Sequence, residues 1–354
     1  MSRTSLPSLL RALRLGQTVA GAAQAVDADY DGIDDALEWT LAVRHAPVVY
    51  LSPWESNLPA NVEWFLDRAR LRFHHSCSAL ALCCGDHGIF DYGGASQATL
   101  VTQTHSKRAW SLFSGCHHTS PQSSGGDWDD DHHFFLQLRD SDHSGSWYPG
   151  DWKVYVHAYP NNIGGINVQY WFFYAYNSGP VEFNHEGDWE NILIQLDASQ
   201  NVVKVLMARH NDPYHQFSPG SVTWYQGTHP VVLSAEGTHA TYESFDSCNG
   251  ALIEHGCAWG HPSWRWFTWS GGLPAGEGGY QGGGLINVGE KGYPLNGQRF
   301  IKYSGRWGEL GVTPWTNGPR GPAYQDKWNY GRASSGGGGG CEEATDDPFL
   351  IEPC

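Results

Sequence analysis

The chain has 354 residues and a formal net charge of −16, from 37 acidic and 21 basic side chains. This acidic balance argues against nucleic acid or a bare anionic membrane as a partner, because both are bound through basic patches. The 44 glycines, 19 prolines and 17 tryptophans, with only 16% charged residues, are typical of short strands joined by long loops and argue against a helical bundle.

The first 26 residues form a leader-like segment that carries three arginines and no acidic residue. It ends in Ala-Gln-Ala, which is similar to a signal-peptide cleavage site, but two arginines interrupt the apolar core. An amphipathic leader helix with Leu6, Leu9, Leu10 and Leu13 on one side is the open alternative. The sequence has no apolar run of 18 residues, so we expect no transmembrane span.

An acidic loop, a helix and a strand are predicted in this order between residues 26 and 51. Leu37, Trp39, Leu41 and Ala42 give the helix an apolar stripe, and Pro47 ends it. Residues 27–38, "DADYDGIDDALE", have the ligand spacing of an EF-hand-type calcium loop, with Gly32 at the turn position. The predicted Ca²⁺ ligands are Asp27, Asp29, Asp31, Asp35 and Glu38. In the alternative interpretation the loop is an acidic turn in which Asp34 or Asp35 caps the helix.

Residues 65–150 are predicted to be rich in loops and contain Cys77, Cys83, Cys84 and Cys116. The total of eight cysteines is even, but the adjacent Cys83 and Cys84 need separate partners, and the sequence fixes no pairing. Plausible local bridges join Cys248 to Cys257 and Cys341 to Cys354. With only two methionines, this cysteine content favours a secreted or extracytoplasmic protein. The cluster "GDWDDDHHFF", with Asp129 to His133, is interpreted as a solvated loop entering a strand.

From residue 151 the pattern becomes strongly β, with β-branched and aromatic runs separated by Gly, Asn, Asp or Pro turns. The runs begin with "WKVYVHAYP" and "INVQYWFFYAYN" and continue to "HPVVLSAEGTHATY". We therefore expect an all-β fold, a largely antiparallel β-sandwich, as a single domain over residues 27–333. Residues 334–354 are predicted to be a Gly-rich linker with an acidic tail. We also expect a monomer.

The stretch "NHEGDWENI" contains the most concentrated polar chemistry. Asp188 and Glu190 share one face of a strand that starts near Gly187, and His185 lies at the junction with the preceding loop. Together these three can converge on one divalent cation such as Ca²⁺ or Mg²⁺. The alternative is an acid-rich loop that simply enters a strand.

This block and its surroundings resemble a known family. The window "YWFFYAYNSGPVEFNHEGDWE", the preceding "VYVHAYP" and the later "SAEGTHATYES" are similar to the vacuolar protein sorting-associated protein 62 family. The segment "LAVRHAPVVYLSPWESNLPANVEWFL" looks like the opening of that family. The resemblance covers about residues 27–310, and it pairs His239 with the first block in a shared cleft, with Tyr242 as a lining group.

The same block more distantly resembles the metal-binding heptad of the necrosis- and ethylene-inducing cytolysins, secreted β-sandwich proteins that bind a cation and plant sphingolipid head groups. That resemblance places metal ligands at His185, Asp188 and Glu190, with Asn177 where the cytolysins have an aspartate. Glu186-Gly187 replaces their central His-Arg. These departures weaken the expectation of cytolysis more than that of the metal site.

The sequence is compatible with several classes of function. "WRWFTW" places Trp264 and Trp266 where they could stack on sugar rings, although tryptophan is also common in sandwich cores. We expect a cation-containing site that recognises a glycan or glycolipid head group. The alternatives are a polysaccharide hydrolase or lyase that uses His185, His239, Asp188 and Glu190, a cytolysin-like membrane-damaging protein, and a calcium-stabilised structural module. The sequence leaves catalysis open.

Overall fold

A computed structural model describes residues 26–75, 88–106, 118–119, 121–122, 132–180, 184–210, 212–252, 254–257, 261–309, 311 and 316–333. The predicted leader lies outside these ranges apart from its last residue, as do Cys77, Cys83, Cys84, Cys116 and Asp129 to Asp131. The predicted tail, with Cys341 and Cys354, lies outside them as well.

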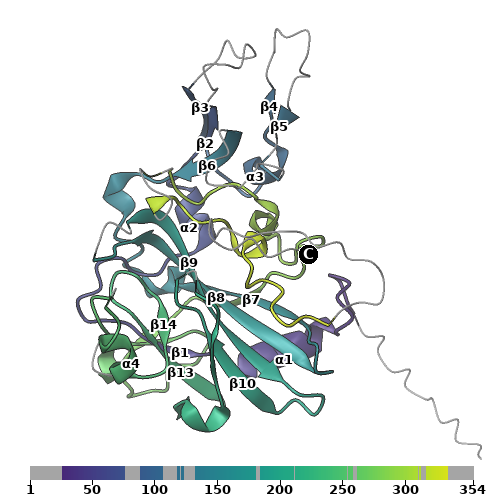
Figure 1. Ribbon diagram of the computed structural model, residues 1–354, viewed down its shortest axis with the longest axis vertical. Coiled ribbons are helices and arrows are strands. Elements are labelled where there is room, and N and C mark those ends of the chain that lie inside the picture. Colours follow the sequence, from purple (N-terminus) through teal and green to yellow (C-terminus); the bar gives the residue numbers. More distant parts are fainter. Residues whose placement is uncertain are drawn as a thin grey trace, which may run out of the picture.

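The described chain is mostly β, with short helices between the strands (Figure 1). The α-helices are α1 (Asp35–Arg44), α2 (Val62–Leu66), α3 (Thr99–Thr102) and α4 (Phe245–Asn249). The strands are β1 (Val48–Tyr50), β2 (Arg70–His75), β3 (Gly88–Gly94), β4 (His105–Ser106), β5 (His118–Thr119), β6 (His132–Gln137), β7 (Lys153–Pro160), β8 (Ile166–Asn177), β9 (His185–Leu196), β10 (Val202–Met207), β11 (His215–Phe217), β12 (Trp224–Tyr225), β13 (His229–Ser234), β14 (Thr241–Tyr242), β15 (Arg265–Phe267), β16 (Tyr280–Gln281) and β17 (Gly284–Asn287).

Two six-stranded sheets carry most of these strands. One has the order β12-β13-β1-β15-β16, with β14 also paired to β13, and the other has the order β11-β10-β9-β8-β7-β17. Most neighbours are antiparallel, as expected, but β1 with β13, β15 with β16, and β17 with β7 are parallel. A three-stranded sheet, β3-β2-β6, lies at one end of the molecule, away from α4 (Figure 1).

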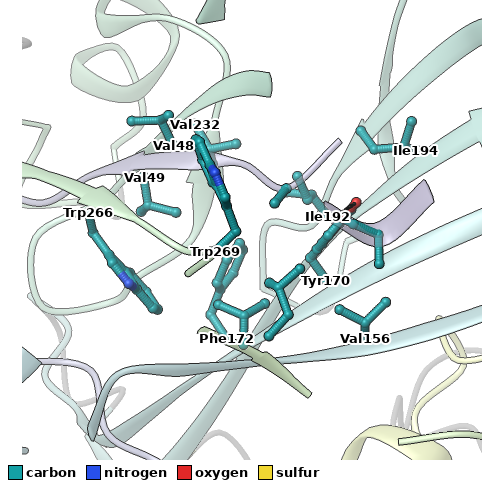
Figure 2. Packing of buried hydrophobic residues seen from close by; sticks show 14 of the residues in the cluster. Val48, Val49, Val156, Tyr170, Phe172, Ile192, Ile194, Val232, Trp266 and Trp269 are labelled. Carbon is teal, nitrogen blue, oxygen red and sulfur yellow. Dashed lines mark hydrogen bonds between the residues drawn. The ribbon is translucent and has the colours of Figure 1, made fainter. Parts of the chain in front are cut away.

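The two large sheets share one apolar core. Figure 2 shows Val48 and Trp266 from the first sheet facing Tyr170, Phe172 and Ile192 from the second. A second core covers the opposite face of β8 and β9 and includes residues of the three-stranded sheet. Burial on both faces explains why "YWFFYAY" is continuously apolar rather than alternating, since neither face of β8 meets water.

The predicted helix is confirmed, but its buried face differs from the expected stripe. α1 begins after Asp34, which caps it by accepting hydrogen bonds from the next turn, and it ends before Pro47. Leu41 is buried, whereas Trp39 is 44% exposed. Glu38 takes a place on the buried face instead, because it points into the acidic loop that precedes the helix.

The region predicted to be rich in loops contains more structure than expected. Among its described residues, β2, β3 and β6 pair in one antiparallel sheet, and Phe73 and Phe134 bury their rings there. In β2, Arg70, Arg72 and His74 alternate with Leu71 and Phe73, a period-2 strand pattern that the expectation of a loop-rich region overlooked. β6 has no such alternation, because two histidines are followed by three apolar residues. In the described residues no helix is long and apolar enough to cross a membrane.

Candidate functional site

The block from His185 to Glu190 begins β9, opposite the end of β8. Antiparallel pairing sets Asn177 opposite His185 and Tyr174 opposite Asp188. Gly187 has a φ of 60°, and a Cβ there would meet the carbonyl oxygen of Trp307 at 2.1 Å. Only glycine fits both the left-handed backbone and this close approach. The block therefore enters the strand as the sequence predicted, but the strand starts at His185 rather than at Gly187.

His239 lies against this block, as the pairing of the two motifs implied. Its Nδ1 donates to Asp188 Oδ2 at 2.8 Å, and its Nε2 donates to the carbonyl oxygen of Asn57 at 3.0 Å. The ring stacks on Tyr174, with centroids 3.7 Å apart. Glu55 Oε1 lies 3.6 Å from Nε2. His239 is completely buried, and both ring nitrogens are engaged.

The charges of this cluster are set by burial and by close pairing. Burial opposes a charge on His239, but the carboxylates of Glu55 and Asp188 outweigh it and raise its pKa to about 10. Burial would also raise the pKa of Glu55, yet His239 and two backbone N–H groups lower it. The arrangement is thus an imidazolium held between two buried carboxylates.

Glu190 lies deeper in the same acidic neighbourhood. Burial, and then the charge of Asp188, raise its pKa well above the ordinary value. Because this shift favours the protonated carboxyl, a metal ion at Glu190 would compete with a proton. Nearby, Glu254 accepts hydrogen bonds from Tyr242 at 2.9 Å and His210 at 2.7 Å, and also from Thr238.

The ligand set implied by the cytolysin resemblance stays a prediction. His185 turns its Nδ1 to the carbonyl oxygen of Gly187 at 2.9 Å, and burial lowers its pKa. Within the described ranges, three sets of His, Cys, Asp or Glu ligand atoms lie within 4.8 Å of one another, and none of them contains His185, Asp188 or Glu190. Two sets join the loop before α1 to the first turn of that helix, and the third joins Asp140, His143 and Glu186.

The loop before α1 brings its acids together as the calcium spacing requires. Asp29, Asp31 and Glu38 form one converging set, and Asp27, Asp29 and Asp35 form the other. Both oxygens of Asp29 and one each of Asp31 and Glu38 are buried without a hydrogen-bond partner. Buried oxygens of this kind are rare in folded proteins unless an ion or water meets them.

The pKa values of Asp29 and Glu38 also show that the negative charges of the loop are not fully balanced by positive ones. Burial and the charge of Asp31 raise the pKa of Asp29 to about 7, and burial and the charge of Asp29 raise that of Glu38 to about 9. Gly32 turns the chain with a φ of 95°. The other Glu38 oxygen accepts from Asn287 Nδ2 at 2.7 Å, which joins the loop to the end of β17. The donor set is entirely oxygen, and it fits Ca²⁺.

The two tryptophans predicted to stack on sugars, Trp264 and Trp266, differ in exposure. Trp266 is fully buried in the shared core, so its indole is not available to a ligand. Trp264 is partly exposed at the end of a 3-10 turn. Tyr242 is buried, with the guanidinium of Arg209 4.1 Å above its ring and its hydroxyl bonded to Glu254. A lining role for Tyr242 remains a prediction.

Sequence reasoning missed the surface next to the buried cluster. Trp54, Trp147 and Tyr148 are 71%, 73% and 70% exposed. They lie on two loops, residues 52–59 and 143–148, that are joined by a hydrogen bond of 2.9 Å from Asn57 Nδ2 to the carbonyl oxygen of His143. The letters "SPWESN" and "SGSWYPG" set aromatic residues among turn formers without strand periodicity, a signal that could have revealed them.

Comparisons with known proteins identify no family. No family model matches the chain, and no curated protein matches it either, so the resemblance to the protein 62 family stays a prediction.

The chain has low structural similarity to solved structures of necrosis- and ethylene-inducing cytolysins. "NLPPya in complex with glucosamine" has 16% identity over 83% of this chain and 87% of that chain, with a TM-score of 0.33. "NLPPya in complex with mannosamine" has 14% identity over 83% and 88%, with a TM-score of 0.34. "Crystal structure of Necrosis and Ethylene inducing Protein 2 from the causal agent of cocoa's Witches Broom disease" has 15% identity over 56% and 76%, with a TM-score of 0.22. At these scores the likeness carries no argument about this chain.

The position of His239 does not suit proton transfer to a substrate. A catalytic base needs a ring nitrogen or carboxylate within reach of a substrate. His239 has no exposed surface, and its two nitrogens are bonded inside the protein. Its visible effect is to join β9 to the loop of residues 52–59, which it contacts at both Glu55 and Asn57.

Proposed function

We propose that this protein is a secreted, calcium-binding β-sandwich that recognises a glycan or glycolipid head group. The observation that carries the proposal is the set of buried, unpartnered carboxylate oxygens on Asp29, Asp31 and Glu38. Burying several carboxylates without partners is costly, and a bound cation removes that cost. The disulfide between Cys248 and Cys257, with Cα atoms 5.8 Å apart, supports an oxidising compartment.

Calcium would act in this proposal as a structural ion. The loop ends in α1, which packs on β7, β8 and β17. Glu38 also bonds Asn287 at the end of β17. When bound, the ion would neutralise the converging carboxylates and hold the N-terminal loop against the second sheet. The sandwich architecture itself is supported by the apolar core that the two six-stranded sheets share.

Head-group recognition is supported by the surface formed by loops 52–59 and 143–148. Flat aromatic rings that are exposed to water match the C–H faces of pyranose rings, and neighbouring polar groups can bond the sugar hydroxyls. Trp54, Trp147 and Tyr148 supply the rings. The buried His239 holds the loop of Trp54 through its bond to the carbonyl oxygen of Asn57. The two loops are joined by the bond from Asn57 to His143, and exposed aromatic side chains on loops are candidates for a binding surface.

The enzyme and cytolysin alternatives gain no comparable support. Hydrolysis or cleavage by His185, His239, Asp188 and Glu190 would need groups that reach a substrate, whereas His239 has no exposed surface and Glu190 is 5% exposed. Asn177, 4% exposed, offers an amide at the position where the cytolysin resemblance expects an acid. A cation at His185, Asp188, Glu190 and Asn177 therefore stays a separate prediction from the calcium loop.

The test is a binding screen of the full chain against a glycan array and against vesicles that carry glycolipids, with calcium or with chelator. We expect binding to a defined set of sugars that Trp54→Ala and Trp147→Ala reduce at least tenfold, about the effect of losing one stacking contact. The matched control is Trp39→Ala, since Trp39 is an exposed tryptophan on α1. Binding to no glycan, or equal loss in all three variants, would refute head-group recognition. Calorimetry without calcium uptake would refute the calcium assignment independently.

A further inference from the structure

One converging set of ligands lies outside the calcium loop and outside the predicted metal site. It consists of Asp140, His143 and Glu186. We propose that these three side chains bind a transition-metal ion of the zinc or manganese class. The inference does not depend on glycan binding, although the site adjoins the aromatic loops through His143.

The ligand atoms already lie close together. One ligand atom from each of the three residues lies within 4.8 Å of the others, and His143 Nε2 is 3.6 Å from Glu186 Oε1. That separation is too long for a hydrogen bond, but it suits two atoms that share a metal at about 2.0–2.2 Å. His143 Nε2 is buried and has no hydrogen-bond partner. An unpartnered ring nitrogen that faces a carboxylate is the feature an ion would complete.

Both inner ligands are held in place by contacts that leave the facing atoms free. The His143 ring stacks on Tyr176, with centroids 4.0 Å apart and planes at 14°. Its carbonyl oxygen accepts from Asn57 Nδ2 at 2.9 Å. Glu186 Oε2 accepts from the backbone N–H of Leu138 at 3.0 Å, which turns Oε1 toward the histidine. Such supporting contacts are typical of residues that ligate metals.

The charge around the three residues favours a cation. Asp140 is exposed on a 3-10 turn, and the carboxylate of Glu309 lies near enough to Glu186 and Asp140 to feel their charges. Three arginines of this region have acidic partners of their own: Arg139 pairs with Asp142 at 2.8 Å, Arg68 with the same residue at 3.7 Å, and Arg72, which also acts on Glu309, with Asp91 at 3.8 Å. The set therefore keeps an excess of negative charge.

The mixture of donors identifies the class of ion. One imidazole nitrogen with two carboxylates suits zinc or manganese, whereas calcium takes oxygen ligands. The chain would then separate two ions by donor type, with calcium in the all-oxygen loop and the transition metal here. Within the His-Glu-Gly-Asp-Trp-Glu block the ligand would be Glu186, in place of the three residues that the cytolysin resemblance implies.

The test is titration of the full chain with Co²⁺ and with Zn²⁺ while Ca²⁺ is kept in excess, followed by the visible spectrum of bound cobalt and by calorimetry. We expect one tight site whose affinity falls at least tenfold in His143→Gln and in Asp140→Asn. Asp140 is exposed, so the second variant keeps the fold even if the first is destabilised. Thermal unfolding without transition metal checks the fold of each variant.

His185→Gln separates this site from the predicted neighbouring one. Unchanged affinity in His185→Gln, with weaker binding in the other two variants, supports the proposal. Weaker binding in His185→Gln alone would move the ion to the set implied by resemblance and overturn it. Equal affinity in all variants, or no stoichiometric uptake of either metal, would also overturn it. Calcium uptake by the loop is measured separately, so neither result decides the proposed function.

Discussion

Replacing His239 with glutamine should strongly destabilise the protein at neutral pH. The change removes the positive charge and leaves Asp188 and Glu55 buried without their counter-charge. The pKa of His239 is raised from 6.5 to about 10. At about 1.4 kcal/mol for each pH unit, protonated His239 contributes about 4 kcal/mol to the free energy of unfolding at pH 7. Breaking a buried pair by losing one partner costs about 3–5 kcal/mol, which agrees.

The sign of the pH dependence follows from the raised pKa. A group that binds its proton more tightly when folded stabilises the fold fully below the unfolded pKa, and that contribution is lost as the pH rises towards about 10. Between pH 7 and pH 9 the wild-type protein should therefore lose about 2–3 kcal/mol relative to His239→Gln. The variant should be less stable at neutral pH, but its free energy of unfolding should change less between pH 7 and pH 9.

The assay is urea unfolding followed by tryptophan fluorescence, at pH 7 and at pH 9, with calcium present. His185→Gln is the matched control, because among the described residues the hydrogen bonds of His185 go to backbone carbonyl groups. We expect it to cost about 1 kcal/mol or less. A loss below about 1 kcal/mol in His239→Gln, or parallel pH slopes in the wild type and that variant, would refute the buried imidazolium.

Three further predictions rest on other parts of the fold. Chelation of calcium should lower the midpoint of thermal unfolding, and Glu38→Gln should abolish the response; an unchanged midpoint on chelation would contradict the calcium loop. Gly187→Ala should destabilise by more than Gly227→Ala, because both have positive φ but only Gly187 meets a backbone carbonyl. Equal losses of stability for the two variants in urea unfolding would show that the positive φ alone, and not the close carbonyl, determines the cost. Replacing Cys248 and Cys257 with serine should lower the free energy of unfolding by about 2–3 kcal/mol, because the unfolded chain gains loop-closure entropy. Calorimetry measures this loss, and an unchanged stability would contradict the prediction.

Local sequence pattern predicted the long strands well. β7 and β8 match the aromatic and β-branched runs, because side chains of that shape pack well on a sheet. The helix at Asp35 was predictable from its cap and from Pro47. The apolar stripe gave the wrong buried face because it counted Trp39, whereas the calcium spacing had already placed Glu38 together with Asp29 and Asp31.

The candidate site was predictable in its residues but not in its contacts. His239 and Asp188 are distant in the sequence, and no local spacing tells that they pair at 2.8 Å. Likewise, the sequence marked Glu186 only as a difference from the cytolysin heptad. In the structure its carboxylate faces His143. Trp266 was a candidate for sugar stacking but is buried in the core. Its burial depends on which sheets face each other, and local sequence does not contain that information.

The pairing of β1 governs the order in which the chain can assemble. β1 lies beside β13 and β15, strands that come more than half the chain length later. Contacts that distant form slowly, because a long loop must close before any of them can stabilise the sheet. The calcium loop depends on Asn287 in the same way. During synthesis β1 must therefore wait for strands that are made much later, and Glu38 must wait for Asn287. The calcium proposed for the loop would be fixed against the second sheet only after that residue has been made.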